Sequence, residues 1–167
     1  MNNDLTAQDI QKMREELDDR RLRLMPELIE EVKRTRAFGD LSENYEYKAA
    51  KQEQNRNKSR IRYLERMIAS AHVIEDMSAD DEVGLYDKVT LRLIELGKEK
   101  TVQVVTTVRC DALHGLVSKE SPIGRVILGR RAGDTVTVHV SDANSYHAEI
   151  LSIEKQTDDG SAPIVRF

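Results

Sequence analysis

The chain has 167 residues and a formal net charge of −4; 34% of its residues are charged, only 4% are aromatic, and Trp is absent. This length suits one ordinary domain or two small ones, and the negative charge argues against a general duplex-DNA binder held by phosphate contacts. No apolar run approaches the roughly 18 residues of a membrane span, and no secretion signal is visible at the N-terminus. The lone Cys110 excludes an internal disulfide and fits a reducing cytoplasm.

Two stretches of the first half carry residues at the 3/4 spacing of a coiled-coil seam. The first has Ile10, Met13, Leu17, Leu24, Leu28, Val32 and Thr35, and the second has Tyr47, Ala50, Gln54, Asn57, Ile61, Leu64, Ile68 and Ala71. Residue numbers of facing positions in an antiparallel hairpin add to a nearly constant value. That value is 81 from Ile10 with Ala71 to Leu24 with Asn57, and 82 from Leu28 with Gln54 to Thr35 with Tyr47. The spacing therefore predicts one antiparallel helical hairpin that projects about 45 Å.

Three features interrupt the apolar seam. Arg20 falls opposite Ile61, and we expect its stem to lie along the seam while its guanidinium reaches out to solvent. Pro26 removes the backbone bond to the carbonyl of Leu22, which predicts a kink or a short break. Gln54 and Asn57 make the middle of the seam polar, which lowers stability but helps to fix the register.

The second half has the period of β-strands. Runs at 88–93, 101–108, 135–140 and 147–153 are rich in Val, Ile and Thr, with turn residues at Gly97 and at 132–134. Ser121 and Pro122 predict the N-cap and first position of a short helix that Gly129 ends. The predicted fold class is α+β, with a coiled-coil hairpin at 1–76 (tip at about 36–46), a linker at 77–86, an antiparallel sheet with one short helix at 87–155, and a tail at 156–167. We expect poor order in the tail, although its last four residues could pair or dock.

The predicted tip holds two carboxylates, Asp40 and Glu43, and two interpretations of them are open. In one, the D-x-x-E pattern is a capping box, with Asp40 capping the second helix and Glu43 reaching back. In the other, the pair contributes to a Mg²⁺ site, since Mg²⁺ prefers oxygen ligands and often takes only one or two carboxylates. Two carboxylates alone make a weak site, so the hairpin would complete a metal site on another molecule.

Basic residues gather in the second arm, and again two interpretations remain. Only Glu53 and Glu65 oppose a set of seven: Lys48, Lys51, Arg56, Lys58, Arg60, Arg62 and Arg66. Such a run is commonly a solvated helix face. The alternative is a basic strip suited to nucleic acid or to an acidic protein channel.

The chain resembles the bacterial Gre family of transcript cleavage and transcription elongation factors, in particular its GreA branch. The similarity runs from about residue 5 to residue 154, and its most specific part is the tip sequence 39–51. Further segments carry the resemblance: 14–17, 25–30, 71–75, 121–129 and 133–136.

The resemblance implies a fold and a function. Gre factors insert their coiled coil through the secondary channel of RNA polymerase, and their two tip acids help to hold the second Mg²⁺ of the polymerase active centre. The polymerase then cleaves the backtracked nascent RNA near its 3′ end, so the factor is not itself a nuclease. On this basis Asp40 and Glu43 would share Mg²⁺ with the polymerase, with no cofactor bound stably by the factor alone.

The resemblance also assigns other residues and partners. Arg36 and Lys51 match basic positions that contact RNA or the channel; Tyr47 is a further candidate, although packing of the tip explains it equally well. The family's C-terminal domain is FKBP-like and docks on the polymerase rim, for which the candidates are Ser121, Pro122, Ile123, Gly124 and Arg125. We expect a cytoplasmic monomer that contacts no membrane.

Three segments depart from the family's pattern, namely 108–118, 141–147 and the tail at 156–167. Two other functions stay open beside cleavage stimulation. One is a Gre-like channel binder that regulates polymerase without stimulating cleavage. The other is a coiled-coil chaperone or prolyl isomerase, although a chain this poor in aromatic residues cannot easily build an isomerase pocket.

Overall fold

The computed structural model describes residues 3–39 and 44–165, and the chain divides into two compact units. One unit comprises residues 1–3 and 9–72, and the other comprises residues 4–8 and 73–167. Strands β1 (Asn3–Leu5) and β2 (Ala71–Val73) form a two-stranded sheet. Within the described ranges, no helix is long and apolar enough to cross a bilayer.

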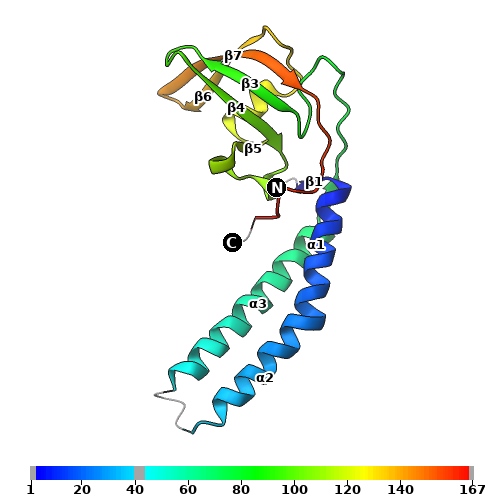
Figure 1. The fold of residues 1–167 in the computed structure, drawn as a ribbon, viewed down its shortest axis with the longest axis vertical. Helices are drawn as coiled ribbons and strands as arrows, with labels where there is room; N and C mark the ends of the chain where they lie inside the picture. Colours follow the sequence, from blue (N-terminus) through cyan, green and yellow to red (C-terminus); the bar gives the residue numbers. More distant parts are fainter. Residues whose placement is uncertain (1–2, 40–43, 166–167) are drawn as a thin grey trace. The chain divides into compact units, whose positions relative to one another are not determined.

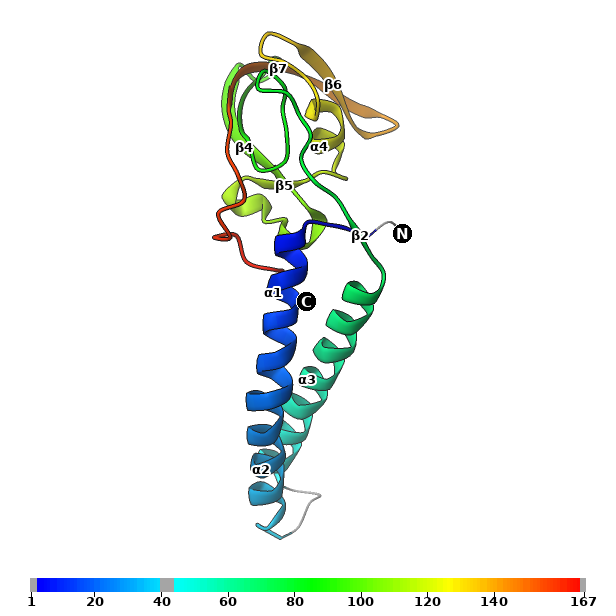
Figure 2. The same ribbon diagram turned by 90° about the vertical axis from the view of Figure 1, so that its right-hand side faces the viewer.

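The first unit is the predicted antiparallel helical hairpin (Figures 1 and 2). Its first arm consists of α1 (Ala7–Asp19), a π-helical segment η1 (Arg20–Leu24) and α2 (Met25–Arg36). Its second arm is the single helix α3 (Tyr45–Ala69). The arms lie side by side in both views, and the ends of α2 and α3 that flank the tip are adjacent.

The irregularity that Pro26 predicts is present as a π turn. The N–H of Met25 donates to the carbonyl of Arg20, five residues back, and Pro26 follows in the first turn of α2. A proline ring clashes with the carbonyl four residues back in a regular α-helix, and here that carbonyl belongs to Leu22, inside the π turn. The extra residue in this turn explains why the sum of facing residue numbers rises from 81 to 82 between Leu24 and Leu28.

The seam of the hairpin is more polar than predicted. Met13, Leu17 and Leu64 are buried, but so is Arg60, which is only 8% exposed. The prediction that the Arg20 guanidinium reaches solvent is wrong. It donates from Nε to Oε1 of Glu16 (2.8 Å) and from Nη1 to Oδ1 of Asn57 (2.9 Å), because these acceptors replace water within the seam.

The second unit is built on a five-stranded sheet in the order β5-β4-β3-β7-β6. The strands are β3 (Lys88–Leu93), β4 (Lys98–Val105), β5 (Leu116–Ser118), β6 (Thr135–Ser141) and β7 (Asn144–Glu154). All neighbouring pairs are antiparallel, as predicted, except that β5 runs parallel to β4. The sequence did not predict β5, since three residues are too few to show an alternating pattern.

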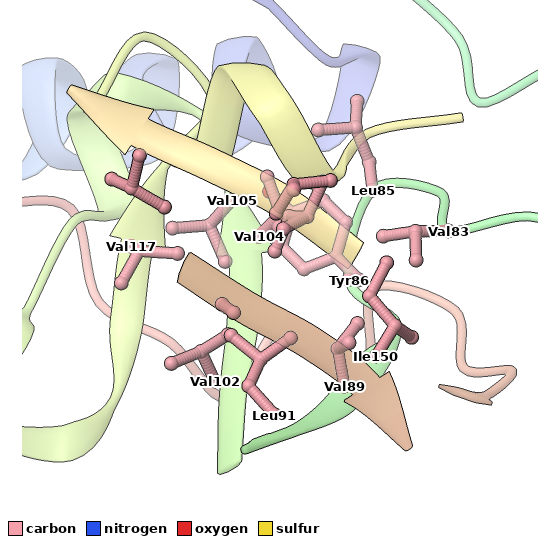
Figure 3. Close-up of a cluster of buried hydrophobic side chains, with 14 residues drawn as sticks. Val83, Leu85, Tyr86, Val89, Leu91, Val102, Val104, Val105, Val117 and Ile150 are labelled. Carbon is pink, nitrogen blue, oxygen red and sulfur yellow. The ribbon is translucent and has the colours of Figure 1, made fainter. Parts of the chain in front are cut away.

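Short helices complete this unit. α4 (Pro122–Ile127) has the predicted N-cap at Ser121, and the 3₁₀ segments η2 (Thr107–Arg109) and η3 (Ala112–His114) lie between β4 and β5. Buried side chains of all five strands and of the segment 83–86 form the core shown in Figure 3, and Ile127 of α4 packs into it. The predicted α+β class is therefore confirmed.

The tail is bound to the second unit, which corrects the expectation of poor order. Both Asp158 oxygens accept from the guanidinium of the fully buried Arg109 (3.2 and 2.9 Å), and the carbonyl of Ala162 accepts from its Nη1 (2.9 Å). The N–H of Val165 donates to the carbonyl of Val108 (2.7 Å), and Ile164 is buried. The suggestion that the end of the chain could dock holds for these described residues.

Candidate functional site

The described flanks of the hairpin tip converge on one carbonyl group. The carbonyl oxygen of Thr35, in the last turn of α2, accepts from the Asn44 side-chain amide (2.7 Å) and from the N–H of Phe38 (3.2 Å). Thr35 is buried, and its hydroxyl donates to the carbonyl of Glu31 (2.9 Å). The two arms are thus tied together immediately before the tip residues.

Asp40 and Glu43 lie outside the described residues, so the structure gives no position for either carboxylate. It does identify the cap of the second helix. α3 begins at Tyr45, and Asn44 is its N-cap, with Oδ1 accepting from the N–H of Tyr47 (2.9 Å). The interpretation in which Asp40 caps this helix is therefore wrong, because Asn44 fills that role.

The other tip candidates lie on both arms. Arg36 is exposed at the end of α2, and Lys51 is exposed on α3 with its Nζ 3.3 Å from Oε1 of Gln54. Tyr47 is half-buried in the first turn of α3, which agrees with a packing role. Both basic side chains are exposed on the arms that flank the tip.

The basic strip of α3 is only partly neutralised by carboxylates. Lys58, like Lys51, donates to Gln54 Oε1 (3.4 Å), and Arg62 donates to the hydroxyl of Ser59 (3.2 Å). In α1, η1 and α2, by contrast, Arg20, Arg21, Arg23, Lys33 and Arg34 each pair with an acidic residue. The positive potential of the hairpin therefore concentrates on α3.

One member of the strip is turned inward instead. Arg60 donates from Nε and Nη2 to the two oxygens of Glu16 (both 2.9 Å), and its guanidinium lies 4.9 Å from the ring centroid of Tyr63. Burial alone would raise the pKa of Glu16, but hydrogen bonds from Arg60 and then Arg20 outweigh it and lower the pKa below its ordinary value of 4.5. This network joins the two arms of the hairpin.

The proposed docking segment has a structural explanation for most of its residues. The Ser121 hydroxyl accepts from the N–H of Gly124 (3.1 Å) and donates to the carbonyl of Ser118 (2.6 Å), and Pro122 occupies the start of α4. Ile123 packs against the core, and Gly124 is buried. Arg125 is exposed, and its Nη2 lies 3.1 Å from Oε2 of Glu120, so it is the member best placed to reach a partner.

Sequence reasoning missed two groups that matter for the site. Asn44 was read only as part of the tip motif, although an Asn immediately before a helical pattern is itself a capping signal. The Glu16–Arg60 pair was missed because Arg60 lies one position before the seam residue Ile61, and spacing alone does not reveal an inward-facing arginine.

In the ranges 3–39 and 44–165, no group of three or more His, Cys, Asp or Glu side chains could hold a metal ion. The donor set at the tip consists of two carboxylates by sequence, which fits Mg²⁺ in kind but is too small to bind it firmly. A metal at the tip would therefore depend on ligands from another molecule.

Two family models match nearly the whole chain. One, described as "Transcription elongation factor, N-terminal", matches residues 3–73, and the other, "Transcription elongation factor, GreA/GreB, C-term", matches residues 78–155. The hairpin and most of the sheet unit thus each have a family counterpart, and the tail after residue 155 has none in these matches.

Individual relatives agree with these matches. Transcription elongation factor GreA of Thermosipho melanesiensis is 40% identical over 150 residues, which span 90% of this chain and 95% of that protein. GreA of Streptococcus sanguinis is 39% identical over 152 residues, or 90% of this chain and 94% of that protein. Among solved structures, GreA factor homolog 1 (Gfh1) of Thermus thermophilus is 25% identical, with 93% of this chain and 100% of that chain covered and a TM-score of 0.43.

Proposed function

The chain belongs to the GreA/GreB family of transcription elongation factors, and from this premise we propose that it stimulates RNA cleavage by RNA polymerase. The hairpin enters the secondary channel of the polymerase and carries Asp40 and Glu43 to the active centre. The polymerase hydrolyses the backtracked nascent RNA, a 3′ fragment leaves, and the arrested complex resumes elongation. The factor supplies two acid groups and is not itself the nuclease.

The construction of the tip supports this proposal most directly. Asn44 is the N-cap residue of α3 and its side-chain amide binds the carbonyl of Thr35, so neither acid occupies the N-cap position. Two carboxylates that are not the N-cap, in the sequence between arms that are tied just before them, are suited to act on a partner. In the alternative, a channel binder without cleavage activity, the acid pair would have no role.

The chemistry assigned to this chain is limited to positioning. Asp40 and Glu43 would offer oxygen ligands to the second Mg²⁺ of the polymerase active centre, and that ion, when bound, activates a water for attack on the phosphodiester. Arg36, Lys51 and the basic strip of α3 would hold the hairpin beside the RNA or the channel wall through charge. Arg125 of α4 would contact the polymerase rim.

The proposal is tested by RNA cleavage in a stalled, backtracked elongation complex. Wild-type protein should release short 3′ RNA fragments, whereas Asp40→Asn/Glu43→Gln should release none above the polymerase's own rate yet still compete with a known secondary-channel ligand. Wild-type protein that competes without stimulating cleavage would support the regulator instead. If the double variant lost competition or unfolded, the acids would be structural and the proposal would fail.

A further inference from the structure

We propose that Phe38 and Tyr45 form a stacking platform for unpaired bases of the backtracked RNA. The inference rests on the proposed function, which brings the tip to the RNA 3′ end, and it names what the tip recognises there. Stacking would hold the RNA while Asp40 and Glu43 act, so the two rings are positioning residues.

Exposure singles these two rings out. Phe38 is 59% and Tyr45 79% exposed, whereas the other Phe and Tyr side chains in the described part of the chain are buried or half-buried. A large exposed aromatic ring gains little from folding, so two of them at one end of a hairpin point to a binding surface.

The backbone brings together the two segments that carry these rings. The N–H of Phe38 and the side-chain amide of Asn44 both donate to the carbonyl oxygen of Thr35, so the segments before and after the tip meet at one atom. Tyr45 directly follows Asn44 as the first residue of α3. Arg34 of α2 and Glu46 of α3 also approach each other across the arms, at 3.8 Å.

Each ring has a cation over it. The Arg34 guanidinium lies 5.3 Å from the centroid of Phe38, and the Lys48 ammonium lies 5.4 Å from that of Tyr45. These contacts orient the rings and place positive charge beside them. Between residues 33 and 51 the chain has five basic and three acidic residues, so the tip region is net positive although the whole protein is negative.

This combination favours nucleic acid over a protein surface as the occupant. Single-stranded RNA is bound by aromatic rings that stack on bases together with cations that offset the phosphates. A protein partner would bury an apolar patch, but the exposed residues around these rings, Arg36, Ala37 and Glu46, are charged or small. The residues around the two rings thus suit a nucleotide base and its phosphate better than an apolar protein surface.

The test uses backtracked complexes whose extruded RNA ends in 6-thioguanosine, which crosslinks to adjacent groups under long-wave ultraviolet light. Wild-type protein should crosslink at the tip, and Phe38→Leu/Tyr45→Leu should reduce the yield about tenfold, because leucine keeps apolar bulk but cannot stack. The variant Phe38→Tyr/Tyr45→Phe, which keeps both aromatic rings, should give the wild-type crosslinking yield. The matched control is Tyr63→Leu, which removes a similar ring–cation pair about 27 Å further along α3.

A second readout is the cleavage rate as a function of the backtracked 3′ base. Wild-type protein should act faster on a purine than on a pyrimidine, and the leucine variant should lose that difference while still competing for the channel. Equal crosslinking by wild type and the leucine variant would overturn the inference. Weaker binding of the leucine variant to polymerase that holds no extruded RNA would also overturn it, because the rings would then contact the polymerase itself. Ring-dependent crosslinking without stimulated cleavage would keep the stacking platform and refute the proposed function instead.

Discussion

Gly124 shows how a single residue of the docking segment serves the fold. A Cβ on this residue would lie 2.1 Å from the carbonyl oxygen of Ser118 and 3.1 Å from the Cα of Lys119, both backbone atoms that cannot rotate away. The same carbonyl accepts the Ser121 hydroxyl, so the start of α4 is locked to the end of β5. Only a residue without a side chain fits this contact.

Gly124→Ala should therefore destabilise the protein by roughly 1–3 kcal/mol, the usual effect of overpacking a tight site. Urea unfolding followed by circular dichroism would measure the change. Arg125→Ala, one residue further on and exposed, should stay within about 0.5 kcal/mol of wild type while weakening polymerase binding. Equal stability of Gly124→Ala and wild type would contradict the assigned packing.

At the scale of elements, the hairpin is held in register by a polar layer. Glu16, Arg20, Asn57 and Arg60 form hydrogen bonds across the two arms, in a seam that elsewhere buries Met13, Leu17 and Leu64. Shifting either arm would leave these buried and half-buried charges without their partners. Such a layer favours one register over its alternatives, because each mispaired charge would lose its hydrogen bonds without regaining water.

Glu16→Gln should lower the free energy of unfolding by roughly 2–3 kcal/mol near neutral pH, less than for a fully buried pair because Glu16 is 20% exposed. The pKa of Glu16 is lower in the folded state, so its stabilising contribution is complete above pH 4.5 or so. This contribution disappears as the pH falls through the folded-state pKa. The free energies of unfolding of wild type and Glu16→Gln should then converge.

Chemical unfolding of both proteins at a series of pH values would test this prediction. Glu27→Gln, in an exposed pair with Arg23, is the control and should change stability by no more than about 0.5 kcal/mol at any pH. If the difference in free energy of unfolding between wild type and Glu16→Gln did not become smaller in acid, the ion pair would not be its source.

At the scale of the whole molecule, the tail and a segment of the sheet unit belong to one structural feature. Arg109 lies in η2, within the family match, and Asp158 lies in the tail beyond residue 155, where that match ends. The buried guanidinium needs the Asp158 carboxylate, and the tail is held by that pair and by the Val165–Val108 backbone bond. The two segments are therefore interdependent.

Asp158→Ala should lower the melting temperature by at least about 5 °C, because it leaves a buried cation without this carboxylate. Removal of residues 156–167 should lower it further. Differential scanning calorimetry would measure both, with Thr157→Ala, an exposed tail residue, as the control. If the truncated protein and the full chain had the same melting temperature, the tail would contribute nothing to the stability of the fold.

The sequence alone determined the hairpin, the buried side of its arms and the α+β class, because heptad and alternating patterns report directly which side of each element is buried. It also determined the cap of α4, because the Ser121 side chain accepts a hydrogen bond from a backbone N–H three residues on and Pro122 suits the first helical position. Each of these features depends on residues close together in the chain or on a long repeated pattern.

The tertiary structure decided the features that depend on single contacts between distant residues. Arg60 turns inward because it donates to Glu16 on the other arm. Asn44, rather than Asp40, caps α3, and its side-chain amide also binds the carbonyl of Thr35. Asp158 pairs with Arg109, which lies 49 positions earlier in the chain. No periodic pattern encodes such contacts, since a polar side chain has the same identity whether it faces solvent or a buried partner. Only the fold, by removing water from these groups, makes one partner necessary for each.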